Sequence, residues 1–130
     1  MIEFQLDSTS GVATYLQLVQ QVHQALQLGL LEPGDQLPTA QQTVARLAIN
    51  PNTVHKAYRD LEREGLVRAR PGQGTFIIKS LPRPDPALQA RFLKSMIKWL
   101  NEATEAGLSP NDIDAIYRSA ERNMLIEGVA

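Results

Sequence analysis

The chain contains no cysteine among its 130 residues, so disulfide bonds, cysteine-ligated metal sites and catalytic thiols are excluded. No apolar run approaches the roughly 20 residues needed to span a bilayer. The N-terminus lacks the positive start and the apolar segment of a signal peptide. We therefore expect a cytoplasmic protein in a reducing setting, with no membrane partner.

Positive charge is missing from the first third of the chain. Residues 1–45 contain four acidic residues and no lysine or arginine, whereas residues 46–98 hold eleven basic residues against four acidic ones. Residues 99–130 return to an acidic excess, and the net charge is −1. That net charge alone argues against a nucleic-acid partner. A basic block between two acidic ones, however, is the asymmetry expected of a surface that faces nucleic acid, with chance clustering as the alternative.

Catalytic chemistry has little support in the sequence. The two histidines, His23 and His55, lie on different predicted elements, and no Ser–His–acid set or metal-ligand cluster is visible. Gly72 and Gly74 follow one predicted strand and precede another, so they do not open a helix as a dinucleotide-binding fingerprint would. We expect neither an enzyme nor a cofactor.

Residues 50–65 are predicted to form a helix with both ends marked. Asn50 is a good N-cap, Pro51 suits the first helical position, and Gly65 can take the left-handed position after the last turn. A helical wheel gives an apolar stripe of Val54, Ala57, Tyr58 and Leu61, opposite a face of Asn52, His55, Lys56, Arg59 and Arg63. This second face carries no carboxylate and suits phosphate oxygens and base edges, although an ordinary solvated face is the alternative.

Two shorter segments before it also read as helices. Residues 14–28 carry apolar residues at the spacing of a buried helical stripe. Thr39 begins a second helix that runs to about residue 47, with Gln42 completing a capping box and with Val44 and Leu47 buried. Residues 2–7 are expected to form an extended arm, and residues 36–37 a very short strand or an extended link. The helix that begins at Thr39 and the helix of residues 50–65 are joined by a tight turn, and the second of these two has a basic face. This pair indicates a helix-turn-helix.

The periodicity changes after the helix of residues 50–65. Residues 66–70 and 75–78 predict two strands, joined by a tight turn over residues 71–74. Glycines 72 and 74 have no Cβ, so the tip of this hairpin can lie close to a phosphate backbone. A hairpin directly after a helix-turn-helix predicts a winged helix.

The remaining residues predict a stiff linker and two helices. Three prolines at alternate positions stiffen residues 80–86. The next helix ends at Gly107, and Ser109, Pro110 and Asp112 start the last one. Their apolar stripes are wide, and two helices cannot enclose a private core, so we expect them to pack against the same pair of a second chain. Folding back on the winged helix is the alternative. The predicted interface residues are Leu88, Phe92, Met96, Trp99, Leu100, Ile113, Ile116, Tyr117 and Ala120.

The predicted fold class is therefore mostly α, an α+β winged helix followed by a two-helix dimerisation segment. The expected domains are a winged helix-turn-helix over residues 1–79, a proline-rich linker over residues 80–86 and a dimerisation domain over residues 87–130.

Residues 15–78 also resemble the DNA-binding domain of the GntR family of bacterial transcriptional regulators. The resemblance rests on the P-G-D-Q-L-P turn, the L-E-R-E-G-L-V run and the G-Q-G-T-F wing at their mutual spacings. The N-P-N-T-V and A-Y-R-D-L-E segments are most similar to the YtrA subfamily. The resemblance implies a dimeric winged-helix repressor, in which the starts of the second and third helices and the wing tip touch DNA.

The residues that we expect at DNA follow from this resemblance and from the basic helix face. They are Thr39, Gln41, Asn50, Asn52, Thr53, His55, Lys56, Arg59, Arg70, Gly72, Gln73, Gly74 and Thr75. Asn52 and His55 are the expected base readers. The lysine and the two arginines would neutralise phosphates, while the threonines at 53 and 75 and the wing backbone would position the domain.

The chain departs from the family pattern at two of these places. Gln41 stands where the family usually has arginine, and Pro71 stands where the wing often has a second arginine. Both changes remove a positive charge next to DNA and favour contact through hydrogen bonds over ion pairing.

The sequence thus predicts a sequence-specific DNA-binding regulator, a repressor that binds a palindromic double-stranded operator as a homodimer. The alternative is a winged-helix module for protein–protein contact, whose basic face docks an acidic partner. No small-molecule effector is specified by the sequence.

Overall fold

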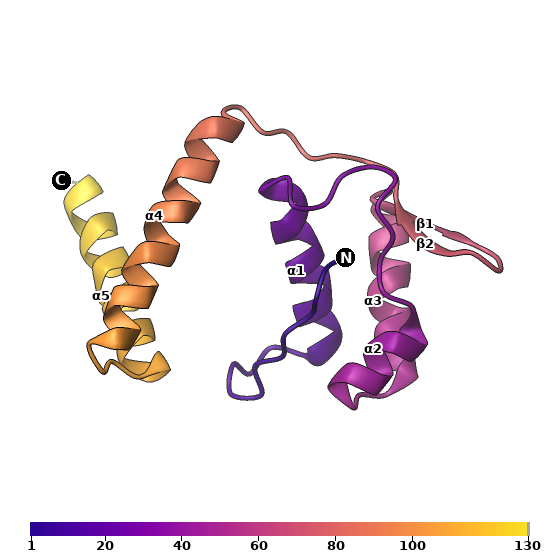
Figure 1. Ribbon diagram of the computed structural model, residues 1–130, viewed down its shortest axis with the longest axis horizontal. Coiled ribbons are helices and arrows are strands. Elements are labelled where there is room, and N and C mark those ends of the chain that lie inside the picture. Colours follow the sequence, from indigo (N-terminus) through magenta and orange to yellow (C-terminus); the bar gives the residue numbers. More distant parts are fainter. Residues whose placement is uncertain (130) are drawn as a thin grey trace. The chain divides into compact units, whose positions relative to one another are not determined.

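The computed structural model describes residues 1–129, with side chains described through residue 124. It divides into two compact units, Met1–Pro86 and the residues from Ala87 onward. Figure 1 shows the helices and the two-stranded hairpin of the described residues. The elements of the first unit are α1 (Thr14–Gln27), α2 (Ala40–Leu47), α3 (Pro51–Arg63), β1 (Val67–Arg70) and β2 (Gly74–Ile77).

The core of the first unit is built around α3, which packs against α1, α2 and β1. Because apolar side chains recur on one side of α1 and one side of α3, each helix buries a single stripe. The predicted apolar stripe of α3 is confirmed, since all four of its residues are buried. Side chains with no exposed surface include Leu18, Val22, Leu37, Val54 and Leu61.

The short helix α2 has the predicted ends but a different buried residue. Thr39 and Gln42 form the expected capping box, and Ala48 closes the helix in the left-handed conformation with φ of 54°. The expectation that Val44 and Leu47 are buried was wrong, because both are only partly buried. Thr43 is buried instead, and its hydroxyl donates to the Thr39 carbonyl at 3.0 Å, which satisfies the polar group in the interior.

The sheet is a two-stranded antiparallel hairpin, in which Val67 pairs with Ile77 and Arg70 with Gly74. The strands begin and end within one residue of their predicted bounds. The segment before α2 lies along the outer side of β2. Gln36 forms a bridge with Phe76, and the Leu37 N–H donates to the Thr75 carbonyl at 2.9 Å. The link predicted at residues 36–37 thus forms an isolated bridge beside β2, outside the two strands of the wing.

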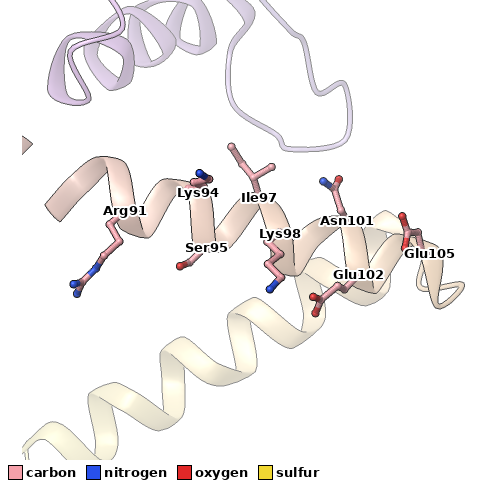
Figure 2. A pocket seen from close by; sticks show the side chains of 8 residues that line it. All are labelled: Arg91, Lys94, Ser95, Ile97, Lys98, Asn101, Glu102 and Glu105. Atoms are coloured by element: carbon pink, nitrogen blue, oxygen red, sulfur yellow. The ribbon is translucent and has the colours of Figure 1, made fainter. Parts of the chain in front are cut away.

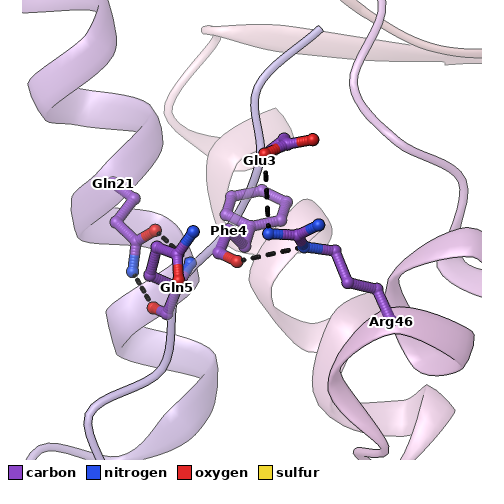
Figure 3. Close-up of polar contacts among 5 residues, drawn as sticks. All are labelled: Glu3, Phe4, Gln5, Gln21 and Arg46. Atoms are coloured by element: carbon purple, nitrogen blue, oxygen red, sulfur yellow. Dashed lines mark hydrogen bonds and ion pairs between the residues drawn. The ribbon is translucent and has the colours of Figure 1, made fainter.

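The N-terminal arm is extended and closes one side of this core (Figure 3). Phe4 is buried in the core, and the main chain of Gln5 exchanges two hydrogen bonds with the side-chain amide of Gln21 on α1. On the other side, Arg46 of α2 donates to the Phe4 carbonyl at 3.5 Å and lies 3.6 Å from the Glu3 carboxylate. The arm therefore ties α1 to α2.

The second unit is a helical hairpin of α4 (Pro86–Glu105) and α5 (Pro110–Val129). The predicted start of α5 is confirmed, because Ser109 and Asp112 exchange the two hydrogen bonds of a capping box at 2.9 and 3.1 Å. The Ser109 N–H that donates to the carboxylate, followed by the Ser109 side chain, lowers the pKa of the Asp112 carboxyl. Among the described side chains of this hairpin, Ala103 alone is buried.

None of the helices in the described part of the chain has the length and apolar character needed to cross a bilayer.

Candidate nucleic-acid interface

The exposed face of α3 is held in place by the helix start and by the buried face behind it. The Asn50 side chain accepts a hydrogen bond from the Asn52 N–H at 2.8 Å, and Pro51 occupies the first helical position. The Asn50 oxygen is thus engaged as the cap. Asn52, His55 and Arg59 lie exposed on the side opposite the core stripe. This side presents an amide, an imidazole and a guanidinium, a set that can hydrogen-bond to base edges and phosphates.

Two basic residues of this face have partners within the protein. The Lys56 ammonium lies 3.9 Å from the centroid of the Tyr15 ring on α1, a cation–π contact. The Arg63 guanidinium lies 3.2 Å from the Asp60 carboxylate. The predicted face carries no carboxylate of its own, and the partner of Arg63 is Asp60, a residue outside that face. The charge of Arg63 is partly balanced, while that of Arg59 is not balanced by any ion pair among the described residues.

The start of α2 offers backbone donors beside a polar side chain. Thr39 Oγ1 accepts from the Gln42 N–H at 3.0 Å, and the Gln42 side chain accepts from the Thr39 N–H at 2.9 Å. Gln41 is exposed next to this cap. The first turn of a helix carries free N–H groups and the positive end of the helix dipole, so this end can receive a phosphate oxygen.

The wing tip is a tight turn closed by its own backbone. The Gln73 N–H donates to the Arg70 carbonyl at 2.9 Å, and the Arg70 guanidinium stacks 4.8 Å from the centroid of the Phe76 ring. Gly72 and Gly74 have φ of +73° and +126°, a region that favours glycine. Arg70, Gly72 and Gln73 are exposed. The turn thus presents the Arg70 guanidinium and the exposed backbone of Gly72.

All the predicted DNA-contacting residues fall in the first unit, at the start of α2, on α3 and on the wing. Most are exposed, whereas Thr53, Gly74 and Thr75 are half-buried. Since α2 and β1 both pack on α3, the structure brings these three elements onto one framework. Within the described residues, no cluster of histidine, aspartate and glutamate side chains could hold a metal ion.

Sequence reasoning missed the residues that join these elements to one another. The Tyr58 hydroxyl donates to the Pro38 carbonyl, and burial raises the pKa of Tyr58 to about 12. The Glu62 carboxylate accepts from the Ala69 N–H at 2.8 Å, which ties α3 to β1. Gln36 reaches the wing tip. A helical wheel indicates that Tyr58 is buried, but it gives no sign of the partner of its hydroxyl.

Comparison with known proteins agrees with this arrangement. Residues 14–77 match the sequence profile of the gntR family of bacterial regulatory proteins. The chain is 32% identical over 125 residues to the HTH-type transcriptional repressor YtrA of Bacillus subtilis (strain 168), which covers 96% of this chain and 88% of that protein. The uncharacterised HTH-type transcriptional regulator YhcF of the same organism is 32% identical over 105 residues, or 80% of this chain and 86% of that protein.

Solved structures show the same fold. A YtrA transcription factor of the GntR family from Sulfolobus acidocaldarius superposes with a TM-score of 0.52 and 26% identity, over 91% of this chain and 97% of that one. A transcriptional antiterminator from Listeria monocytogenes EGD-e has a TM-score of 0.57 at 24% identity, over 95% and 92% of the two chains. The named relatives are transcriptional regulators and not enzymes. The chain belongs to the gntR family of bacterial regulatory proteins, as a DNA-binding transcriptional regulator related to YtrA.

Proposed function

We propose that this regulator is a cytoplasmic repressor that binds a two-fold operator as a homodimer, with α3 of each chain in a major groove. The observation that carries the proposal is the division of α3 into two faces. One face of α3 is buried in the core. The opposite face presents exposed polar and basic groups, as do the α2 start and the wing. A helix of this kind can enter the groove without disturbing the fold.

The exposed groups divide by chemistry into readers and anchors. Asn52 and His55 carry hydrogen-bonding groups that can distinguish base edges. Lys56, Arg59 and Arg70 carry charges that neutralise phosphates without reading sequence. The hydroxyls of Thr53 and Thr75, the α2 start and the wing backbone position the domain on the duplex.

The partner that we propose for the α4–α5 hairpin is a second copy of the hairpin. Large apolar side chains stay exposed in the single chain, with Phe92 at 60% and Tyr117 at 50%. This unit exposes large apolar side chains and buries little interior of its own. That combination fits a core shared between chains. The other side of α4 is mostly polar, with Arg91, Lys94 and Lys98 followed by two glutamates, and Ile97 lies among them (Figure 2). That polar side would face solvent in the dimer.

Selection from random duplex DNA with the full-length protein tests the proposal. We expect the enriched sequences to contain an inverted repeat, as a two-fold protein requires. Asn52→Ala should then weaken binding to the selected operator by roughly 1–3 kcal/mol, with less effect on random duplex. Equal losses on both DNAs would mean that Asn52 does not read sequence. Failure to enrich any sequence would favour the use of the basic face for a protein partner.

The salt dependence of binding separates the anchors from the readers. Arg59→Ala should reduce the salt slope by about 1 and weaken operator and random duplex alike. Arg63→Ala is the matched control, because Asp60 already balances that guanidinium and a smaller change is expected. An unchanged slope for Arg59→Ala would place this face away from DNA.

A further inference from the structure

We infer that Gln36 is a positioning residue that braces the wing tip for DNA binding. The inference rests on the proposed contact between the wing and DNA. Gln36 lies in the P-G-D-Q-L-P turn, 37 residues before the tip residue that it holds.

The side chain of Gln36 extends the hydrogen-bond ladder of the wing toward its tip. Along the outer side of β2, the backbone ladder ends where the Leu37 N–H donates to the Thr75 carbonyl. Beyond that point, Gln36 Nε2 donates to the Gln73 carbonyl at 3.0 Å. The Gln73 N–H is already bonded to the Arg70 carbonyl. Both backbone polar groups of Gln73 at the tip are therefore engaged.

Gly74 makes room for this contact. A Cβ added to Gly74 would lie 2.4 Å from Gln36 Nε2 and 3.3 Å from its Cδ, so the amide fills the space that a side chain would take. Gly72 provides the contrast, because a Cβ there would meet nothing within 4 Å. The two glycines of the wing thus differ in function. The conformation of Gly72 shapes the turn, and the missing side chain of Gly74 also admits Gln36.

The segment that carries Gln36 also holds the other two elements of the interface. The Pro38 carbonyl accepts the Tyr58 hydroxyl of α3, and Thr39 caps α2. The short segment from Gln36 to Thr39 therefore contacts the wing tip, α3 and the start of α2. A four-residue two-stranded hairpin has little stability of its own. Fixing its tip before DNA arrives lowers the ordering cost of binding.

The test compares variants of the full-length protein on the selected operator. Gln36→Met keeps the length of the side chain and removes its hydrogen-bond donor. We expect it to bind about three- to tenfold more weakly, the range set by one lost hydrogen bond, and to speed hydrogen exchange of the tip amides. Gln20→Ala, which removes an exposed glutamine on α1, is the control. It should leave the operator affinity and the hydrogen exchange of the tip amides unchanged.

A double-mutant cycle with Arg70→Ala shows whether Gln36 acts through the wing. We expect the double variant to lose less affinity than the sum of the two single losses. Fully additive losses would mean that Gln36 acts independently of the wing, and the inference would be wrong. Normal binding by Gln36→Met with weakened binding by Arg70→Ala would also overturn it, while leaving the wing–DNA contact intact. If neither variant weakens binding, the wing contact itself is wrong and the inference falls with it.

Discussion

The two units of the chain place their apolar side chains in opposite ways. The first unit buries a core drawn from the arm, three helices and the wing, and apart from Pro51 the residues that it leaves exposed on α3 are polar or charged. The α4–α5 hairpin buries one alanine among its described side chains and leaves Phe92, Met96, Ile116 and Tyr117 exposed. Hydrophobic burial is the main driving force of folding, so we expect the first unit to fold alone and propose that the hairpin packs against a second copy.

Under the proposed function, this difference assigns DNA binding to the first unit and assembly to the hairpin. In the first unit the core fixes the recognition surface, so a substitution there acts on folding or on DNA. In the hairpin, large apolar side chains are exposed and would pack against a second copy, so we expect a substitution there to act on assembly. The contrast gives each variant below a readout specific to one unit.

The largest effect is expected from Phe92→Glu. A charge placed on the apolar side of α4 would be buried in both halves of the proposed dimer. We expect the dimer dissociation constant to rise by about 10²- to 10⁴-fold, measured by sedimentation equilibrium. Lys98→Gln, on the polar side of the same helix, should leave the constant nearly unchanged. Equal effects of the two changes would remove the distinction between the sides of α4.

Leu61→Ala should strongly destabilise the first unit. Leu61 has no exposed surface, and such substitutions cost roughly 2–5 kcal/mol of unfolding free energy. Leu88→Ala is the matched change on α4, where 41% of the side chain is exposed. Urea unfolding should show a large loss for the first variant, and for the second only a concentration-dependent loss that reflects the dimer. A concentration-independent loss at Leu88 would give the hairpin a private core.

Tyr58→Phe should change how stability depends on alkaline pH. Because burial raises the pKa of Tyr58 to about 12, the folded state favours the neutral phenol. Its contribution is complete below the unfolded pKa of about 10 and is lost as the pH rises toward 12, by roughly 2–3 kcal/mol.

Urea unfolding between pH 8 and pH 11 measures this effect. The Tyr58→Phe variant should lose about 1 kcal/mol at pH 8, because the Pro38 carbonyl loses its partner, and should then decline less steeply. Tyr15→Phe on α1 is the control, since it keeps the ring that Lys56 contacts. A decline as steep as in the unchanged protein would mean that Tyr58 does not carry the alkaline sensitivity.

The two capping boxes offer the smallest and most closely matched pair. Thr39→Ala and Ser109→Ala each remove the side-chain acceptor of a helix start, which costs about 0.5–2 kcal/mol. Thermal unfolding should show that the first loss does not depend on protein concentration and that the second does. The same concentration dependence for both variants would contradict the assignment of α5 to a shared core.

Local signals in the sequence predicted much of this fold. The caps at Thr39, Asn50 and Ser109 and the buried stripe of α3 follow from interactions within a few residues, so one sequence carries them. The bounds of the two strands also followed to within one residue, because the turn between them is marked by glycines. The proposed DNA contacts and the proposed dimer interface stay predictions.

What sequence reasoning missed was partly local and partly long-range. Thr43 is buried, while Val44 and Leu47 pack against the core only partly buried, and a helix of eight residues has too few turns for its pattern to show this. The pair of Arg63 and Asp60 joins residues three positions apart and depends on side-chain conformation. The contact from Gln36 to the wing joins residues 37 positions apart, and only the two glycines of the wing hinted at a close approach.

Sedimentation of the full-length protein beside the fragment of residues 1–86 tests the central claim most directly. At about 20 μM the full-length chain should sediment as a dimer, because its hairpins share a core that one chain cannot form. The fragment should be a folded monomer, because its core comes from its own residues. A monomeric full-length chain, or a fragment that remains dimeric, would contradict the assignment of dimerisation to the α4–α5 hairpin.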